Sequence, residues 1–170
     1  MRVPDRPLEG TFTLLRPVLR DDVDLLVAWH ADPEVSRYWD DETFTREEMA
    51  DRLSRPDVDP YLVMENGQPV GYLQAWFDGD APGNGGLDMF LIPEARGRGL
   101  GPDAARTIAE WLLDSGALRR ITVDPYLTNA RAIAAWRKAG FEPIEQRGPD
   151  EDHLAPWLLM RFTRADPATS

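Results

Sequence analysis

Alternating glycines in the segment Arg96-Gly97-Arg98-Gly99-Leu100-Gly101 restrict the fold of this chain more than any other feature of its sequence. The run 87–92 before this segment is typical of a strand, and the run 102–113 after it has apolar residues at helical spacing. A glycine-rich turn at a helix start lets several backbone N–H groups point at one ligand, where the helix dipole favours negative charge. The segment therefore predicts a strand, loop and helix that together hold a phosphate or pyrophosphate.

The simplest alternative is a glycine-rich turn with no ligand, and two other phosphate-binding folds use a similar pattern. A P-loop ends in Gly-Lys-Ser or Gly-Lys-Thr, whereas this loop ends in Leu100-Gly101-Pro102. A dinucleotide-binding fold carries its glycines after the first strand, whereas here they lie in mid-chain. Both folds are therefore excluded.

Strands and helices are predicted to alternate along the chain, which indicates an α/β or α+β fold with one mixed, twisted sheet flanked by helices. The dipeptide Asn66-Gly67 predicts a tight hairpin, and the glycine-rich run 78–85 predicts a mobile, exposed loop that is a possible lid. Residues 1–170 are expected to form a single domain with a core of about 11–163 and loose termini. The expected strands are 11–18, 60–65, 69–77, 87–92, 120–123 and 157–162, and the expected helices are 20–31, 45–55, 102–113 and 128–139.

The composition of the chain opposes some classes of function and favours others. A net charge of −11 opposes nucleic-acid binding and favours a cationic ligand, although many proteins are acidic only for solubility. The absence of cysteine and the presence of only two histidines favour chemistry without a metal. No apolar run is long enough to cross a membrane and no signal peptide is evident, so a cytoplasmic protein is expected. A monomer and a homodimer are both compatible with the sequence.

Two separated motifs resemble those of the GNAT superfamily of acetyl-coenzyme A-dependent N-acetyltransferases. In the glycine loop, Arg96, Gly99 and Gly101 match the family pattern. The second motif comprises Asp124-Pro125, then 129–133 and 136–141, at the distance that the family shows. The resemblance extends over roughly residues 11–163 and implies a GNAT-type domain with a V-shaped opening between the fourth and fifth strands.

Acetyl-coenzyme A is the cofactor that this resemblance implies. Pantetheine would lie in the V-shaped opening, where a backbone N–H near Phe90 or Leu91 would stabilise the developing oxyanion. Arg96 and Arg98 would add charged contacts to the pyrophosphate, and Asn129 fits both a cofactor contact and a helix cap. The predicted cofactor-binding residues are Phe90, Leu91, Ile92, Arg96, Gly97, Arg98, Gly99, Leu100, Gly101, Pro102, Asn129, Ala132 and Trp136.

Within the superfamily, the chain is most similar to aminoglycoside 6′-N-acetyltransferases, through Tyr38-Trp39, the run 60–72 and Gly86-Leu87-Asp88. This likeness implies that Asp88 is the catalytic base, although a carboxylate at a strand end is also explained as a cap. Asp124 would hold a substrate ammonium, or would only begin a turn. The predicted substrate-binding residues are Trp39, Asp40, Trp76, Asp88 and Asp124. The expected partner is a small cationic amine, and the likeness implies an aminoglycoside.

One departure from the family pattern leaves alternatives open. Many GNAT enzymes have tyrosine where this chain has Trp136, and that hydroxyl is thought to protonate the departing thiolate. The acceptor could instead be another amine, such as a siderophore precursor, a polyamine or a protein N-terminus. A coenzyme A-binding module with weak catalysis is the third hypothesis.

Overall fold

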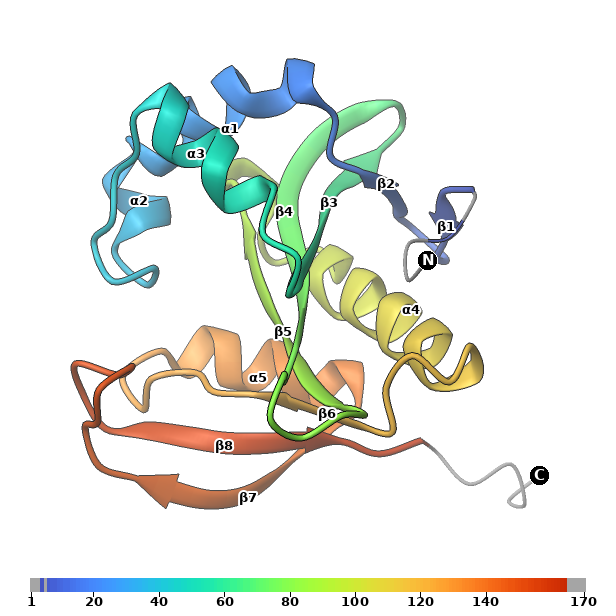
Figure 1. Ribbon diagram of the computed structural model, residues 1–170, viewed down its shortest axis with the longest axis vertical. Coiled ribbons are helices and arrows are strands. Elements are labelled where there is room, and N and C mark those ends of the chain that lie inside the picture. Colours follow the sequence, from blue (N-terminus) through green and yellow to red (C-terminus); the bar gives the residue numbers. More distant parts are fainter. Residues whose placement is uncertain (1–3, 5, 165–170) are drawn as a thin grey trace.

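The computed structural model describes Pro4 and residues 6–164, and its strands form one sheet in the order β1-β2-β3-β4-β5-β6-β8-β7 (Figure 1). Within the described chain, β5 and β6 are the one parallel pair, and all other neighbours are antiparallel. The expectation of a loose tail after Arg164 lies outside the described residues. The strands are β1 (Leu8–Glu9), β2 (Leu14–Pro17), β3 (Val58–Glu65), β4 (Gln68–Phe77), β5 (Asn84–Leu91), β6 (Arg120–Val123), β7 (Phe141–Arg147) and β8 (Trp157–Phe162).

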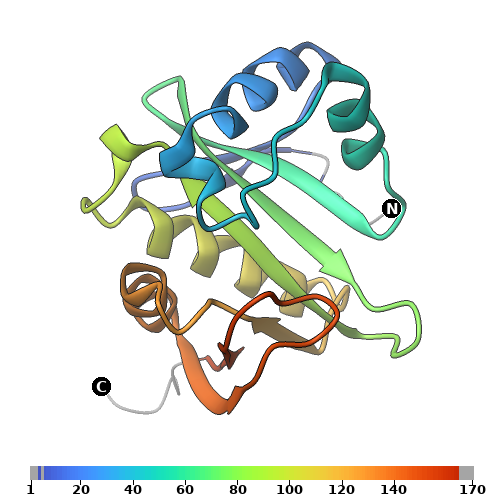
Figure 2. The same cartoon turned by 90° about the vertical axis from the view of Figure 1, so that its left-hand side faces the viewer.

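Helices cover both faces of this sheet (Figure 2). Successive side chains of a strand point to opposite faces, so Leu62 packs with one apolar cluster and Val63 with the other. The first cluster includes α1 (Val23–His30), α2 (Pro33–Ser36) and α3 (Arg46–Leu53). The second includes α4 (Leu100–Asp114) and α5 (Ala130–Ala139). Two 3₁₀ turns, η1 (Arg20–Asp22) and η2 (Pro93–Ala95), precede α1 and α4.

The capping and turn motifs in the sequence correctly predicted the start of α3 and the hairpin between β3 and β4. Thr45 caps α3 by accepting the N–H of Glu48, whose carboxylate accepts the N–H of Thr45 in return. The predicted hairpin turns at Asn66-Gly67, where both residues have positive φ. Pro33, which the sequence suggested only as the end of a helix, is the first residue of the short helix α2.

The N-terminal prediction was wrong in two respects. The strand expected over 11–18 begins only at Leu14, because the Asp103 carboxylate accepts the N–H groups of Thr11, Phe12 and Thr13. Those three N–H groups are therefore not available to a neighbouring strand. Leu8 and Glu9, which precede the expected core, belong to the sheet, since β1 pairs with β2.

Two further segments differ from the prediction. The sequence did not indicate β7, because nearly all of its residues are exposed and it therefore lacks an alternating apolar pattern. The loop expected over 78–85 ends where β5 begins at Asn84. It is tied down by Asp78, which accepts two backbone N–H groups, and by Arg119, which donates to the Pro82 carbonyl. This loop lines none of the cavities described below, so the structure gives no support for a lid.

The predicted V-shaped opening is confirmed between β5 and β6. The two strands pair only as far as Gly86 and Thr122, after which β5 continues along β4 and β6 continues along β8. Glycine is required at this point, since a Cβ on Gly86 would lie 2.3 Å from the Thr122 carbonyl oxygen. The opening therefore begins immediately beyond the last close contact between the strands.

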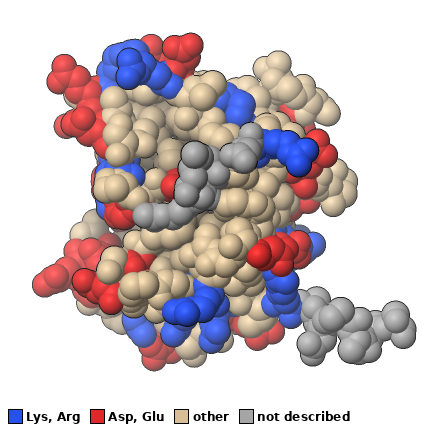
Figure 3. Space-filling view, turned by 45° about the vertical axis from the view of Figure 1, so that its right-hand side comes forward, with Lys and Arg blue, Asp and Glu red and all other residues tan. Residues whose placement is uncertain are grey.

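The surface carries charges of both signs. On the face shown in Figure 3, Lys and Arg side chains occur in separate groups among Asp and Glu, and no single basic patch dominates. No helix in residues 6–164 combines the length and the apolar character that crossing a bilayer requires.

Candidate active site

Two cavities meet at the opening between β5 and β6. The first, here the carboxylate cavity, has a volume of about 280 Å³ and contains the side chains of Asp40, Glu42, Asp88, Asp124 and Asp152 in its wall. The second, here the glycine-loop cavity, has a volume of about 290 Å³ and is lined by the loop before α4 and by one face of α5. The residues shared by both walls include Tyr38, Met89, Phe90, Asn129, Ala132 and Trp136. A ligand can therefore extend from one cavity into the other.

The glycine loop leaves the start of α4 open. Gly97 and Gly99 have φ values of 78° and 81°, which side-chain-bearing residues rarely adopt. Gly99 is the N-cap residue, and no side chain caps the helix there. No heavy atom lies within 4 Å of a Cβ built on either glycine. The first N–H groups of α4 are thus accessible to an anionic ligand, as the sequence predicted for a pyrophosphate.

The two arginines of the loop have different surroundings. Arg96 lines the glycine-loop cavity, and its guanidinium also donates to the backbone oxygens of Leu91 and Glu34. Burial, followed by the nearby charge of Arg131, lowers the pKa of Arg96. Arg98 forms an ion pair with Glu65 at 2.7 Å and lies outside the cavity wall. Arg98 is therefore not placed to make the phosphate contact expected from the sequence.

Two cations that sequence reasoning did not assign line the same cavity from α5. Arg131 and Lys138 are seven residues apart, so they lie on the same face of the helix as Ala134 and Ala135. The sequence carries a signal for this placement, because both residues lie within the second GNAT motif at helical spacing. Together with Arg96 they give the described wall of this cavity three cations, against one carboxylate, that of Glu34.

Backbone geometry corrects the expected oxyanion donor. The bond from Ile92 N–H to the Val70 oxygen fixes which residues of β5 direct their N–H groups to β4. Because alternate residues of a strand bond to opposite neighbours, Phe90 directs its N–H to β4 as Ile92 does. Met89 and Leu91 direct theirs into the V-shaped opening. Of the two residues suggested by the sequence, Leu91 is therefore suitably oriented and Phe90 is not.

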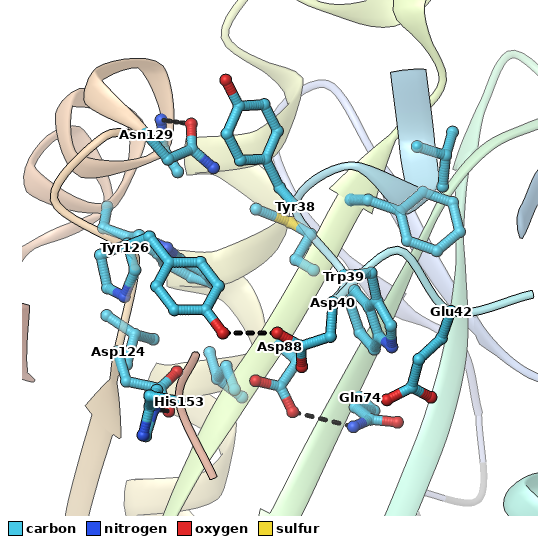
Figure 4. Close-up of a pocket in the computed structure, with 18 of the residues that line it drawn as sticks. Tyr38, Trp39, Asp40, Glu42, Gln74, Asp88, Asp124, Tyr126, Asn129 and His153 are labelled. Atoms are coloured by element: carbon cyan, nitrogen blue, oxygen red, sulfur yellow. Dashed lines mark hydrogen bonds and ion pairs between the residues drawn. The ribbon is translucent and has the colours of Figure 1, made fainter. Parts of the chain in front are cut away.

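Asp88 lies at the centre of the carboxylate cavity (Figure 4). Its Oδ2 accepts the Nε2–H of Gln74 at 2.8 Å, and the Gln74 Oε1 accepts the Tyr72 hydroxyl at 2.7 Å. Burial, and then repulsion from Asp124, raise the pKa of Asp88 to about 7, although Gln74 and Arg52 oppose the shift. A carboxylate with such a pKa is suited to exchange protons near neutral pH.

Asp124 extends from the end of β6 into the same cavity, and His153 holds one of its oxygens. The His153 Nε2 lies 2.7 Å from Asp124 Oδ2. Nearby, the hydroxyl of Tyr126 donates to Asp40, which connects the segment after β6 with the segment after α2. Burial, and then the hydrogen bond to Asp40, raise the pKa of Tyr126 to about 12. Neither His153 nor Tyr126 was identified from the sequence.

Aromatic residues form another part of this wall. Trp39 lines the carboxylate cavity and packs edge-on against Tyr72 and Phe90, with centroid separations of 6.0 Å and 5.7 Å. Trp76 lines neither cavity, because it lies over Gly86 beside the point where the strands separate. The structure therefore brings Trp39, Asp40, Asp88 and Asp124 together, without Trp76.

Most predicted cofactor-binding residues line the glycine-loop cavity; the two that do not are Ile92 and Arg98. Asn129 lines both cavities and also caps α5 by accepting the N–H of Ala132, so its two interpretations are compatible. Trp136 is buried, packs against Phe141 at a centroid distance of 5.2 Å, and still reaches both cavity walls. No group of three or more His, Cys, Asp or Glu side chains suited to a metal ion occurs in the described part of the chain.

The sequence model of the GNAT acetyltransferase domain matches residues 18–147. The chain therefore belongs to the GNAT acetyltransferase family. It is 31% identical over 147 residues to aminoglycoside N(6′)-acetyltransferase type 1 of Klebsiella pneumoniae, covering 75% of this chain and 73% of that protein.

Solved structures agree with this assignment. The structure of AAC(6′)-Ib in complex with paromomycin and acetyl-coenzyme A is similar with a TM-score of 0.79 and 28% identity, over 90% of this chain and 94% of that one. AAC(6′)-Ib in complex with coenzyme A and kanamycin gives a TM-score of 0.78 and 29% identity, over 89% of this chain and 95% of that one. The two cavities thus occur in a fold whose relatives bind both a coenzyme A and an aminoglycoside.

Proposed function

We propose that this protein transfers an acetyl group from acetyl-coenzyme A to the 6′-amine of an aminoglycoside and so gives resistance to the antibiotic. The observation that carries the proposal is the meeting of a pyrophosphate-type cavity with a carboxylate-lined cavity at the V-shaped opening. The likeness to aminoglycoside N(6′)-acetyltransferases supports the choice of acceptor. Acetyl-coenzyme A is an intracellular metabolite, so the proposed reaction takes place in the cytoplasm.

The glycine-loop cavity suits the donor. Backbone N–H groups at the start of α4 would bind the pyrophosphate, and Arg131 and Lys138 would balance phosphate charge from α5. The thioester supplies an activated acetyl group when acetyl-coenzyme A is bound. The N–H groups of Met89 and Leu91, directed into the opening, would then donate to the oxygen on which negative charge develops.

The carboxylate cavity suits a polycationic acceptor. Asp40 and Asp124 would hold ammonium groups, while the exposed edge of Trp39 would contact a sugar ring. An amine attacks only when it is neutral, and a free alkylammonium is mostly protonated at pH 7. Asp88, with a pKa of about 7, would accept the proton that the attacking nitrogen loses.

The departing thiolate does not require an acid from the protein. The indole of Trp136 lies at the junction of the two cavities and does not readily release a proton. A thiol has a pKa near 8.5, so its thiolate is a moderate leaving group that solvent can protonate afterwards. This one substitution relative to the family pattern is also the observation that favours the second candidate, a coenzyme A-binding module with weak catalysis.

Release of the free thiol during incubation with acetyl-coenzyme A and kanamycin or tobramycin tests the proposal. We expect turnover that depends on the aminoglycoside and a product that carries one added acetyl group at the 6′-amine. Tight binding of acetyl-coenzyme A without transfer to any amine would favour the binding module. Turnover only with polyamines, siderophore precursors or peptide N-termini would support acetyl transfer to an amine and would overturn the choice of an aminoglycoside as acceptor.

A further inference from the structure

The loop between β7 and β8 places a histidine between two carboxylates at the edge of the carboxylate cavity. The His153 Nε2 lies 2.7 Å from Asp124 Oδ2, and its Nδ1 lies 2.7 Å from Asp150 Oδ1. The imidazole is 13% exposed, whereas the side chains of Asp124 and Asp150 are 40% and 44% exposed. The ring is therefore the enclosed member of this three-residue cluster.

These contacts determine the charge of the ring. An ionised carboxylate only accepts hydrogen bonds, so both ring nitrogens must donate, and a histidine that donates from both nitrogens is an imidazolium. Burial opposes this charge, but the hydrogen bonds to Asp124 and Asp150 outweigh it and raise the pKa of His153. The ring also stacks on Trp157 at a centroid distance of 4.1 Å, which favours a cation.

The loop is organised around this arrangement. Asp150 Oδ2 accepts the indole N–H of Trp157 at 3.2 Å, and Oδ1 accepts the N–H of Asp152 at 2.9 Å. The N–H of Asp150 in turn donates to the carbonyl of His153 at 3.0 Å. These bonds fix Asp150 before any ligand arrives, so the imidazole is held toward Asp124 by the loop itself.

We propose that His153 is an internal cation that occupies Asp124 in the free protein and is replaced there by an ammonium group of the acceptor, with release of one proton. The inference rests on the proposed function, because it takes Asp124 as an ammonium-binding residue. The Nε2–H bond of His153 breaks and its proton passes to solvent. The neutral ring keeps its Nδ1–H bond to Asp150, and the ligand ammonium takes the vacated position on Asp124 Oδ2.

Other charged groups near the ring are consistent with this exchange. Asp152 lines the cavity from the same loop, Asp88 faces it from β5, and Tyr126 lies with its ring 6.2 Å from that of His153. Asp40 accepts the Tyr126 hydroxyl, and Arg52, the cation in the described wall of this cavity besides His153, is paired with Glu42 at 3.4 Å. The surroundings are therefore mainly anionic, so the incoming ammonium is the new positive charge that drives the proton off.

His153 would therefore make the protein select acceptors that carry a charged ammonium group. A strongly basic ammonium retains its charge while it displaces the imidazolium, whereas a neutral polar group cannot replace the lost charge at Asp124. The exchange would also make acceptor binding weaker at low pH, since the competing imidazolium is then more fully protonated. Binding would strengthen as the pH rises through the pKa of His153.

The chain offers a clear way to observe this titration, because it contains only two histidines. His30 is buried, and burial lowers its pKa to about 4, so it remains neutral where His153 titrates. Magnetic resonance of histidine-labelled protein saturated with coenzyme A would follow the His153 ring before and after addition of kanamycin. We expect kanamycin to convert His153 from the imidazolium to the neutral form at pH 6.

Calorimetric titration of the same complex with kanamycin, in two buffers of different ionisation enthalpy, would count the released protons. Compared with His153→Gln, the wild type should release close to one additional proton at pH 6. The affinity of the wild type for kanamycin, relative to that of His153→Gln, should increase with pH by up to about tenfold per pH unit below the pKa of His153. Asp150 does not itself line the cavity, and Asp150→Asn should move this dependence to lower pH, because His153 loses one carboxylate partner.

Three results would overturn the inference: equal proton release by the wild type and His153→Gln, no change of the His153 signals on addition of kanamycin, or an unaltered pH dependence in Asp150→Asn. The outcome also separates the inference from the proposed function. Acetylation of kanamycin without proton release from His153 would contradict the inference alone. Failure of the wild type to bind kanamycin would overturn both.

Discussion

Replacement of Asp88 by asparagine should make the protein more stable and less active at the same time. The pKa of Asp88 is raised from 3.8 to about 7, mainly by burial, so the folded state opposes ionisation of this carboxyl. A shift of about three units at about 1.4 kcal/mol per unit sets an upper limit near 4 kcal/mol. Because the side chain is partly exposed, we expect a cost of about 1–3 kcal/mol in the wild type.

The sign of this effect depends on pH. Well below pH 3.8 the carboxyl is protonated in the folded and unfolded states alike, so it contributes no difference. As the pH rises toward 7 the unfolded chain ionises first, which lowers the free energy of unfolding of the wild type. Asp88→Asn stays neutral throughout and should therefore gain its full advantage at pH 8 and almost none at pH 3.5.

Denaturant unfolding at both pH values and steady-state acetyl transfer are the measurements. Loss of a positioned general base should reduce kcat by about 10²- to 10⁴-fold, and the rise of wild-type kcat/KM with pH near 7 should disappear. Asp51→Asn removes the same charge from the exposed side of α3 and serves as the matched control. Wild-type activity in Asp88→Asn, or lower stability than the wild type at pH 8, would refute the reasoning.

Three further substitutions test the donor site and the fold. Arg131→Ala should raise the KM for acetyl-coenzyme A about 5- to 20-fold by removing a charged contact, whereas Arg137→Ala, outside the cavity wall on the same helix, should not. Gly99→Ala should cost about 1–3 kcal/mol of stability through its positive φ and weaken coenzyme A binding at least tenfold, measured by unfolding and calorimetry. Asp103→Asn should cost about 2–3 kcal/mol of stability, since the Asp103 carboxylate accepts hydrogen bonds from residues 11–13. Burial opposes ionisation of Asp103, but those bonds lower its pKa. The stability that Asp103 contributes is therefore present above its ordinary pKa and lost in acid. An Asp103→Asn difference that persists unchanged to pH 2 would contradict that explanation.

The donor side of the site could be predicted from sequence because its determinants are local. The glycine loop and the start of α5 are continuous segments, each with recognisable spacing, and the structure brings them to one cavity. Some details were missed: Arg98 pairs with Glu65 outside the cavity, while Arg131 and Lys138 join Arg96 in its wall. The backbone N–H of Phe90 points to β4 and not into the opening.

The acceptor side of the site was harder to predict from the sequence, because it is assembled from segments that are far apart in the chain. Gln74 reaches Asp88 only through the register of β4 and β5, which a sequence does not display. His153 arrives from a loop after β7, a strand whose exposed residues gave no pattern. Trp76 was misplaced for a related reason, since its side chain lies over Gly86 instead of facing the cavity. Contacts that depend on strand pairing can be identified only once the fold is known.

Acetyl transfer to kanamycin by the purified protein tests the central claim most directly. With acetyl-coenzyme A as donor, we predict stoichiometric release of thiol and a monoacetylated product whose acetyl group is bound to the 6′-nitrogen, identified by mass and magnetic resonance. Thiol release no faster than in the absence of acceptor, across a broad set of aminoglycosides, would contradict the claim.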